Sequence, residues 1–193
     1  MAGLGGDVGK TTAVKLTYDD YVLFPDDGMR HELIDGVHYV TPCPNLRHQQ
    51  ILGRLYLAVG NWLEAHSAGQ VLFAPFDVVF TQHDVVEPDL LFVLREHEAS
   101  KLVEKHALGA DLVVEVASPS TRRRDATIKR ELYERAGVRE YWIVDPDKAV
   151  VRVHRLDGAR FASPFELSGE RADVLTTPLL PGLQIPLDRI FRS

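Results

Sequence analysis

Two acidic residues, Asp89 and Glu115, interrupt segments that otherwise read as buried strands. Asp89 follows a proline and precedes Leu-Leu-Phe-Val, and Glu115 lies in the middle of "DLVVEVAS". With the two-residue period of a strand, Val113, Glu115 and Ala117 share one face, and both faces are apolar enough to be covered. A buried ionised carboxylate is costly unless a cation or hydrogen-bond donors satisfy it. We therefore expect each acid to have a partner.

That partner could be a divalent cation shared by the two carboxylates. If the two strands are neighbours, Asp89 and Glu115 meet at one end of the sheet. Two charges about 4 Å apart repel by roughly 4 kcal/mol at an effective dielectric near 20. One carboxyl is then protonated, or a metal lies between them, and Mg²⁺ prefers such oxygen ligands. The alternative, that each acid pairs with an arginine or caps a backbone group, is equally open for either residue alone.

Lys129 lies on the helix that the sequence predicts after Glu115. It stands beside Ile128 and one turn before Leu132 and Tyr133, at the border of the buried face. A lysine in this position can bury its stem and aim its ammonium at the carboxylates, where it could hold or activate a water molecule. The alternative is a solvated lysine on a charged helix.

The elements that must position these residues follow from periodicity and turn chemistry. Apolar residues at three-and-four spacing predict one helix from Asn45 to about Ala65 and a second over "RRRDATIKRELYERAG". Asp35-Gly36 is typical of a hairpin turn. Thr17 and Asp20 form a capping box that predicts a short helix through Leu23. The remaining expected elements are strands in "VLFAPFDVVF", "VVEPDLLFVL" and "DLVVEVAS", a hairpin of "EYWIVD" with "AVVRVHRL", and a strand-like tail from Arg171. This order predicts a mixed α/β (α+β) domain with helices covering a central sheet.

Composition sets the limits on function. The chain has 193 residues, and its net charge of −6 does not indicate a broad basic surface, so any contact with DNA must be local. A single cysteine, Cys43, excludes an internal disulfide. The absence of a long apolar run predicts a cytoplasmic protein that does not interact with membranes. We expect one domain over residues 16–193 after a flexible leader over residues 1–15.

The leader contains "GDVGKTT", which resembles a phosphate-binding loop. The motif requires a glycine at a position that Leu4 occupies here, and no predicted strand precedes it. We therefore expect no nucleotide site in the leader.

Several segments in order carry a resemblance to a known family: "HELIDGVHYVTP", "RHQQILGRL", "VLFAPFDVVF", "VEPDLLFV", "DLVVEVASPST", "RRDATIKRELYERAGVREYWIVDP" and "LPGLQIPL". From about Tyr18 to Phe191 the chain resembles the Uma family of restriction endonucleases, which belongs to the PD-(D/E)XK nuclease superfamily. The resemblance implies a restriction-endonuclease-like fold, with a mixed central sheet flanked by helices.

The resemblance also implies roles for individual residues. Asp89 matches the aspartate of the proline-aspartate motif, and Glu115 matches the second acid. The superfamily lysine normally follows that acid by two residues, but this position is Ala117, so the family lysine is taken to be Lys129 from the next helix. Glu32 matches the early glutamate of the pattern.

By the same resemblance, Asp89, Glu115 and the carbonyl of Val116 would hold Mg²⁺ or Mn²⁺ for hydrolysis of a phosphodiester, with DNA as the expected substrate and a homodimer as the expected assembly. The competing interpretation is an idle nuclease fold that serves as a binding or assembly module. Ala117 and the acidic net charge favour that alternative somewhat.

Five further residues are candidates for auxiliary roles. Asp77 could join the same end of the sheet, and His48 could act as a donor near the site, although a structural role is the alternative for both. The three consecutive arginines that follow the second acid could contact a phosphate backbone, or simply form a solvated charged loop. They are Arg122, Arg123 and Arg124.

Overall fold

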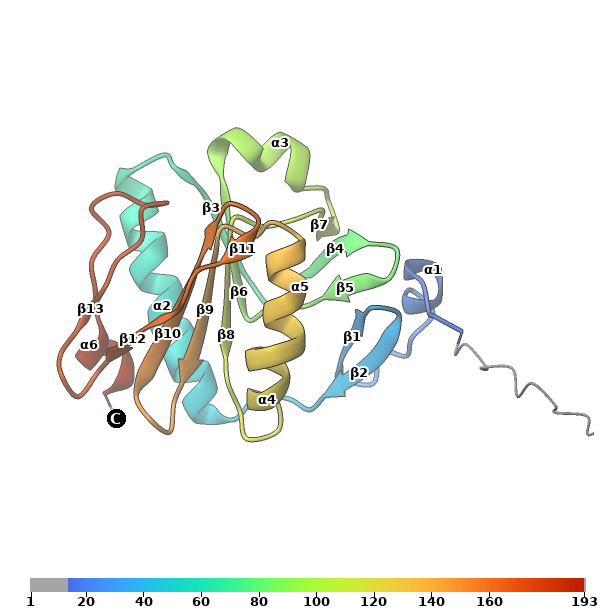
Figure 1. The fold of residues 1–193 in the computed structure, drawn as a ribbon, viewed down its shortest axis with the longest axis horizontal. Helices are drawn as coiled ribbons and strands as arrows, with labels where there is room; N and C mark the ends of the chain where they lie inside the picture. The colour runs from blue at the N-terminus through green and yellow to red at the C-terminus, as the bar shows by residue number, and fades with distance from the viewer. Residues whose placement is uncertain (1–13, 193) are drawn as a thin grey trace, which may run out of the picture.

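The computed structural model describes residues 14–192 and shows a mixed α+β architecture (Figure 1). The predictions for the phosphate-loop-like segment and for most of the leader lie outside the described residues. Within the described range, no helix has both the length and the apolar character needed to cross a membrane.

The central layer is a seven-stranded sheet in the order β11-β10-β9-β8-β6-β3, with β12 also pairing with β10. β8 and β9 are parallel, and the other pairs are antiparallel, so the sheet is mixed as predicted. The strands are β3 Gly69–Phe73, β6 Leu90–Leu94, β8 Leu112–Val116, β9 Glu140–Asp145, β10 Val150–Asp157, β11 Arg160–Phe161 and β12 Phe165–Ser168.

A second, five-stranded sheet has the order β2-β1-β5-β4-β7. Its strands are β1 Arg30–Ile34, β2 Val37–Thr41, β4 Asp77–Thr81, β5 Asp84–Val86 and β7 His106–Ala107. The predicted hairpin of β1 and β2 is confirmed, and Asp35 and Gly36 both have positive φ, the conformation that this tight turn requires.

The prediction of one uninterrupted strand in each of "VLFAPFDVVF" and "VVEPDLLFVL" is wrong. The first segment divides at Ala74 and Pro75 into β3 and β4, and the second divides at Glu87, Pro88 and Asp89 into β5 and β6. In each case one half joins the central sheet and the other half joins the second sheet. Proline cannot donate to a strand ladder, which explains why both breaks contain one.

The two long predicted helices are confirmed. α2 spans Leu46–Ala65, and the Asn45 side chain caps it by accepting a hydrogen bond from the backbone N–H of His48. The second helix runs through α4 (Arg122–Arg124), a π-helical turn (Asp125–Lys129) and α5 (Arg130–Arg135). The shorter helices are α1 Tyr18–Tyr21, a 3₁₀ turn Arg95–His97, α3 Glu98–Lys101 and α6 Leu187–Phe191.

The tail is less strand-like than predicted. It contains the short pair β13 (Val174–Leu175) and β14 (Ile185–Pro186) and ends in α6, which packs beside α2 (Figure 1). Apolar residues from both helices explain the difference, because Leu187, Ile190 and Phe191 are buried in the same core cluster as Leu55 and Val59.

Two hydrophobic cores lie on opposite faces of the central sheet. One core joins the face of Leu112, Val114 and Val116 to α2 and the tail. The other joins the face of Val113 and Ala117 to α5 and the second sheet. The face that carries Glu115 is therefore covered by the π-helical turn, α5 and the second sheet, and side chains from all of these elements can reach it.

Candidate active site

Asp89 and Glu115 lie on neighbouring strands, as the sequence predicts. β6 and β8 are antiparallel with Leu90 opposite Val114, so Asp89 lies across from Glu115 one residue beyond that pair. The Oδ2 atom of Asp89 accepts a hydrogen bond of 2.7 Å from the backbone N–H of Val116. Asp89 immediately precedes β6, and its side chain adds one hydrogen bond to β8 beyond those of the β6 backbone. This bond holds the carboxylate at the end of the sheet.

Two further donors hold the Asp89 carboxylate. Arg30, at the start of β1, donates from Nη1 to Oδ1 at 2.8 Å, and Nε2 of His48, in the first turn of α2, lies 3.0 Å from Oδ2. Burial raises the pKa of Asp89, but His48 and Arg30 outweigh burial and bring the pKa down to about 2. Asp89 is therefore a carboxylate at every pH of physiological interest.

Lys129 reaches Glu115 from the following helix. Its Nζ lies 2.8 Å from Oε1 of Glu115 and 2.7 Å from Oε1 of Glu32 on β1, and the residue is 1% exposed. Burial alone lowers the pKa of Lys129, but Glu115 and Glu32 outweigh burial and hold that pKa above its ordinary value. The lysine is therefore an ammonium group that donates a hydrogen bond to Glu115 and forms an ion pair with Glu32.

Glu115 has an unusual environment for a carboxyl group. Besides Lys129, the hydroxyl of Tyr133 donates to Oε1 at 2.7 Å, one helical turn further along α5. Burial raises the pKa of Glu115 to about 8; Lys129 opposes this rise, and the nearby acids, chiefly Asp89 and Asp125, add to it. Both hydrogen bonds that the structure gives Glu115 end on Oε1, which leaves Oε2 for a ligand.

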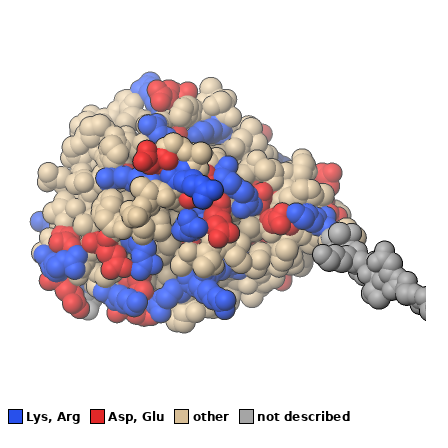
Figure 2. Space-filling view, in the orientation of Figure 1, with Lys and Arg blue, Asp and Glu red and all other residues tan. Residues whose placement is uncertain are grey.

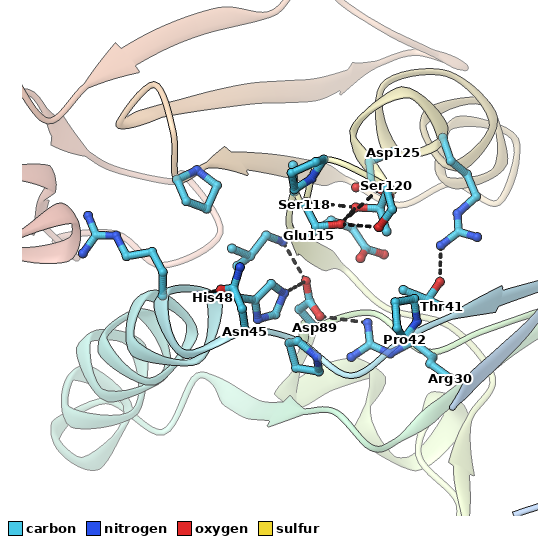
Figure 3. Close-up of a pocket in the computed structure, with 18 of the residues that line it drawn as sticks. Arg30, Thr41, Pro42, Asn45, His48, Asp89, Glu115, Ser118, Ser120 and Asp125 are labelled. Atoms are coloured by element: carbon cyan, nitrogen blue, oxygen red, sulfur yellow. Dashed lines mark hydrogen bonds and ion pairs between the residues drawn. The ribbon is translucent and has the colours of Figure 1, made fainter. Parts of the chain in front are cut away.

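A cavity of about 280 Å³ opens over these groups. The β2–α2 loop and the β8–α4 loop form its walls, and Asp89 and Glu115 lie between them (Figure 3). Val116 also lines the cavity. Lys129 and Asp125 also line it, whereas Glu32 lies behind Lys129 and does not. The cavity gives a small anionic or hydrated ligand access to both acids.

The two auxiliary candidates His48 and Asp77 lie in different parts of the structure. His48 lies in the site against Asp89, whereas Asp77 lines a different hollow, where it accepts a hydrogen bond of 2.8 Å from the hydroxyl of Tyr21. Asp77 is thus near the second sheet but is not brought into the cavity of Asp89 and Glu115.

The three consecutive arginines point in different directions. Arg122 pairs with Asp145 at 3.1 Å and with Asp147 at 2.7 Å. Arg124 turns inward, where its guanidinium lies 5.3 Å from the Tyr39 ring centroid and its side chain bonds to the hydroxyl of Thr41. Arg123 is exposed. Figure 2 shows basic and acidic side chains interspersed on one face of the molecule, without a continuous basic patch.

Three residues of the site carry roles that the sequence did not suggest. Arg30 pairs with Asp89 across the two sheets, Tyr133 donates to Glu115, and Asp125 is a buried acid in the wall of the cavity. Tyr133 was recognisable only as one turn beyond Lys129. For Arg30 no local signal exists, because its contact joins residues 59 positions apart.

The mixed sheet and its flanking helices define a nuclease-like α+β fold, and comparisons with known proteins identify the family. Residues 18–188 match the model of the Uma2 family, described as "Putative restriction endonuclease", and the chain belongs to this family. No curated protein matches the chain.

Among solved structures, the chain is similar to "a putative nuclease belonging to DUF820" from Anabaena variabilis, with a TM-score of 0.76 and 17% sequence identity. The match covers 91% of this chain and 97% of that one. At this identity the similarity shows the fold alone, and it confirms the predicted restriction-endonuclease-like architecture.

Proposed function

We propose that the protein is a nuclease that uses a divalent metal ion to hydrolyse phosphodiester bonds, with DNA as its substrate. The observation that carries this proposal is the contact of 2.8 Å between Nζ of Lys129 and Oε1 of Glu115. It supplies an ammonium group beside the second acid although Ala117 stands where the superfamily lysine is expected. Asp89, Glu115 and Lys129 then form one centre from three different elements.

The residues at the base of the cavity fit a hard cation. Oε2 of Glu115 accepts no hydrogen bond from residues 14–192. Burial raises the pKa of Glu115 and the neighbouring acids add to this rise, so a bound cation would favour the charged carboxylate. Asp89 uses three of its roughly four acceptor positions. Mg²⁺ or Mn²⁺ would be held by Asp89, Glu115 and the carbonyl of Val116.

Two side chains and one carbonyl are few ligands. Among the described residues, no three His, Cys, Asp or Glu side chains are grouped closely enough to hold a metal ion. This suits Mg²⁺, which commonly takes one or two carboxylates and keeps several of its own waters. When bound, such an ion polarises the phosphate and lowers the pKa of a coordinated water.

The other residues of the site orient the acids and the water. Arg30 and His48 fix the two oxygens of Asp89, and Tyr133 fixes Glu115. The ammonium of Lys129 would hold the attacking water or the phosphate by charge-assisted hydrogen bonds. These groups stand in place before substrate arrives, which is the condition for electrostatic stabilisation of a transition state.

Contact with DNA would be local. Arg123 is exposed, and Arg122, which shares its charge with Asp145 and Asp147, could exchange these partners for a phosphate; neither lines the cavity itself. Arg124, held by Thr41 and Tyr39, is better suited to support the wall of the site. We further propose a homodimer, because two copies would present one centre to each strand of a duplex.

The test is a cleavage assay on plasmid and linear DNA with Mg²⁺ or Mn²⁺. Glu115→Ala and Lys129→Ala are compared with wild type and with Glu64→Ala, an exposed acid at the end of α2. Cleavage by wild type and Glu64→Ala, but not by the two site variants, supports the proposal. Cleavage that persists in both site variants contradicts it.

The second candidate is a nuclease fold that binds or assembles without cutting. The observation in its favour is that Asp89 already has a cationic partner, Arg30, together with His48 and a backbone donor, so its charge is satisfied without a metal. Titration with Mn²⁺ in a calorimeter separates the two functions. Binding that disappears in Asp89→Ala supports the metal site, and no response to metal favours the module.

A further inference from the structure

One buried acid in the cavity has no assigned role. Asp125 is 1% exposed, and its Oδ1 has no hydrogen-bond partner among residues 14–192. It lines the same cavity as Asp89 and Glu115, and Figure 3 shows it on the helix above them. A buried carboxylate oxygen without a donor is costly, so its persistence calls for a ligand that the protein alone does not provide.

The local backbone explains how Asp125 reaches this position. The π-helical turn Asp125–Lys129 begins at Asp125 and ends at Lys129, so the widened turn sets both side chains on the inner side of the helix. The backbone carbonyl of Asp125 accepts a hydrogen bond of 3.1 Å from the hydroxyl of Tyr141, a buried residue of β9. Single π turns are rare and occur frequently at functional sites.

The other groups in the cavity cannot take up a proton from water as readily. Lys129 donates a hydrogen bond to Glu115, pairs with Glu32 and, as an ammonium, has no lone pair. Both oxygens of Asp89 already accept from donors, and Glu115 is the proposed metal ligand. Two side chains of the described cavity wall have a buried, unpartnered atom that can accept a proton, Oδ1 of Asp125 and Nδ1 of His48. His48 is already engaged through Nε2 with Asp89, the proposed metal ligand, which leaves Asp125 as the acceptor without another role.

We propose that Asp125 is the general base of the reaction, a catalytic residue that accepts the proton of the attacking water. This inference rests on the proposed function. The water oxygen forms a bond to phosphorus, the bond between phosphorus and the leaving nucleoside oxygen breaks, and the water proton passes to Oδ1 of Asp125. A solvent water protonates the leaving oxygen, and Asp125 then releases its proton to solvent.

The experiment compares Asp125→Asn with Glu131→Gln, the matched change from acid to amide on an exposed residue of the same helix. Single-turnover cleavage and calorimetric Mn²⁺ binding are measured for both. Asp125→Asn is expected to cleave about 10²- to 10⁴-fold more slowly than wild type, the usual contribution of a general base, and to keep Mn²⁺ affinity within about threefold. Glu131→Gln is expected to match wild type in both measurements.

Asp125→Ala provides a second readout that a structural role would not produce. Its smaller side chain leaves space for formate, and added formate is expected to restore cleavage at least tenfold, whereas it leaves Lys129→Ala inactive. If Asp125→Asn fails to fold, the rescue of Asp125→Ala by formate still tests the proposal. Thermal melting shows whether each variant is folded.

Each outcome separates the two proposals. If wild type does not cleave DNA with either metal, the proposed function fails and this inference falls with it. If wild type cleaves and folded Asp125→Asn cleaves at the same rate, the general base is another group and only this inference is overturned. Loss of cleavage in Asp125→Ala without any recovery in formate also overturns it.

Discussion

The ammonium of Lys129 lies 2.7 Å from the carboxylate of Glu32, and this contact connects a helix on the central sheet to the first strand of the second sheet. Glu32 is fully buried, and the same Oε1 accepts the backbone N–H of Glu87 at 3.1 Å, at the point where the chain crosses between the sheets. Lys129 therefore joins the two sheets as well as serving the candidate site.

Replacing Lys129 with methionine should destabilise the fold strongly. The variant keeps the volume of the stem but removes the ammonium from Glu32 and Glu115, and leaves Glu32 with Arg124 at 3.5 Å. Breaking a buried pair in this way typically costs about 3–5 kcal/mol. Urea unfolding measures the loss. The double variant Lys129→Met with Glu32→Gln, which removes both charges, should recover part of it, and equal stability of the single and double variants would show that the pair is not coupled.

Asp89 should make the fold sensitive to acid. Its folded pKa of about 2 lies below the ordinary value of 3.8, because His48 and Arg30 outweigh burial. A depressed pKa contributes stability that is present above pH 4 and is lost as the pH falls from about 4 to about 2, on the order of 2 kcal/mol for a shift of this size. Unfolding free energies of wild type and Asp89→Asn, measured across this range, should differ in slope, with the variant the flatter of the two.

Much of the architecture could be predicted because its signals are local. The turn at Asp35 and Gly36 needs only the two residues that tolerate positive φ, and α2 follows from apolar spacing over five turns with a polar cap at Asn45. The alternation of Val113, Glu115 and Ala117 correctly predicts which face of β8 carries the acid, since both flanking residues lie in the core beneath α5.

The remainder depends on contacts between distant segments. Proline in "FAPFD" and "VEPDL" signals an interruption, but only the assembled protein shows that each chain segment changes sheets there. The pairing of Arg30 with Asp89 and the widened turn before Lys129 have no signature in a single sequence. The site could therefore be predicted as a set of acids and a lysine, whereas the donors that orient them could not.

The contribution of the N-terminal cap of α2 to the free energy of unfolding should be measurable with a single substitution. Oδ1 of Asn45 accepts the backbone N–H of His48 at 2.9 Å, so Asn45→Ala should cost about 1 kcal/mol and loosen the turn that carries His48. Asn61→Ala, an exposed position within the same helix, is the control and should be neutral or slightly stabilising because alanine favours helices. Similar losses in both variants would contradict the cap.

Metal binding should release a proton from Glu115. Burial and the neighbouring acids raise its pKa to about 8, so at neutral pH the carboxyl is mostly protonated and must lose its proton to hold a cation. Mn²⁺ affinity should therefore rise with pH until about pH 8 and then level off. Calorimetry at pH 7 in buffers of different ionisation enthalpy counts the protons released for each Mn²⁺ bound. Close to one proton is expected for wild type, and no proton is expected for Glu115→Gln.

The raised pKa of Glu115 also predicts how the stability of the metal-free protein changes with pH. A carboxyl whose folded pKa lies above its unfolded value of 4.5 contributes stability that is complete below pH 4.5 and is lost as the pH rises through 8. Glu115→Gln should remove this loss, so its unfolding free energy should fall less than that of wild type between pH 5 and pH 8.5. Because Mn²⁺ opposes the loss only when Glu115 is present, saturating metal should raise the melting temperature of wild type more at pH 8.5 than at pH 6 and leave the variant unchanged at both.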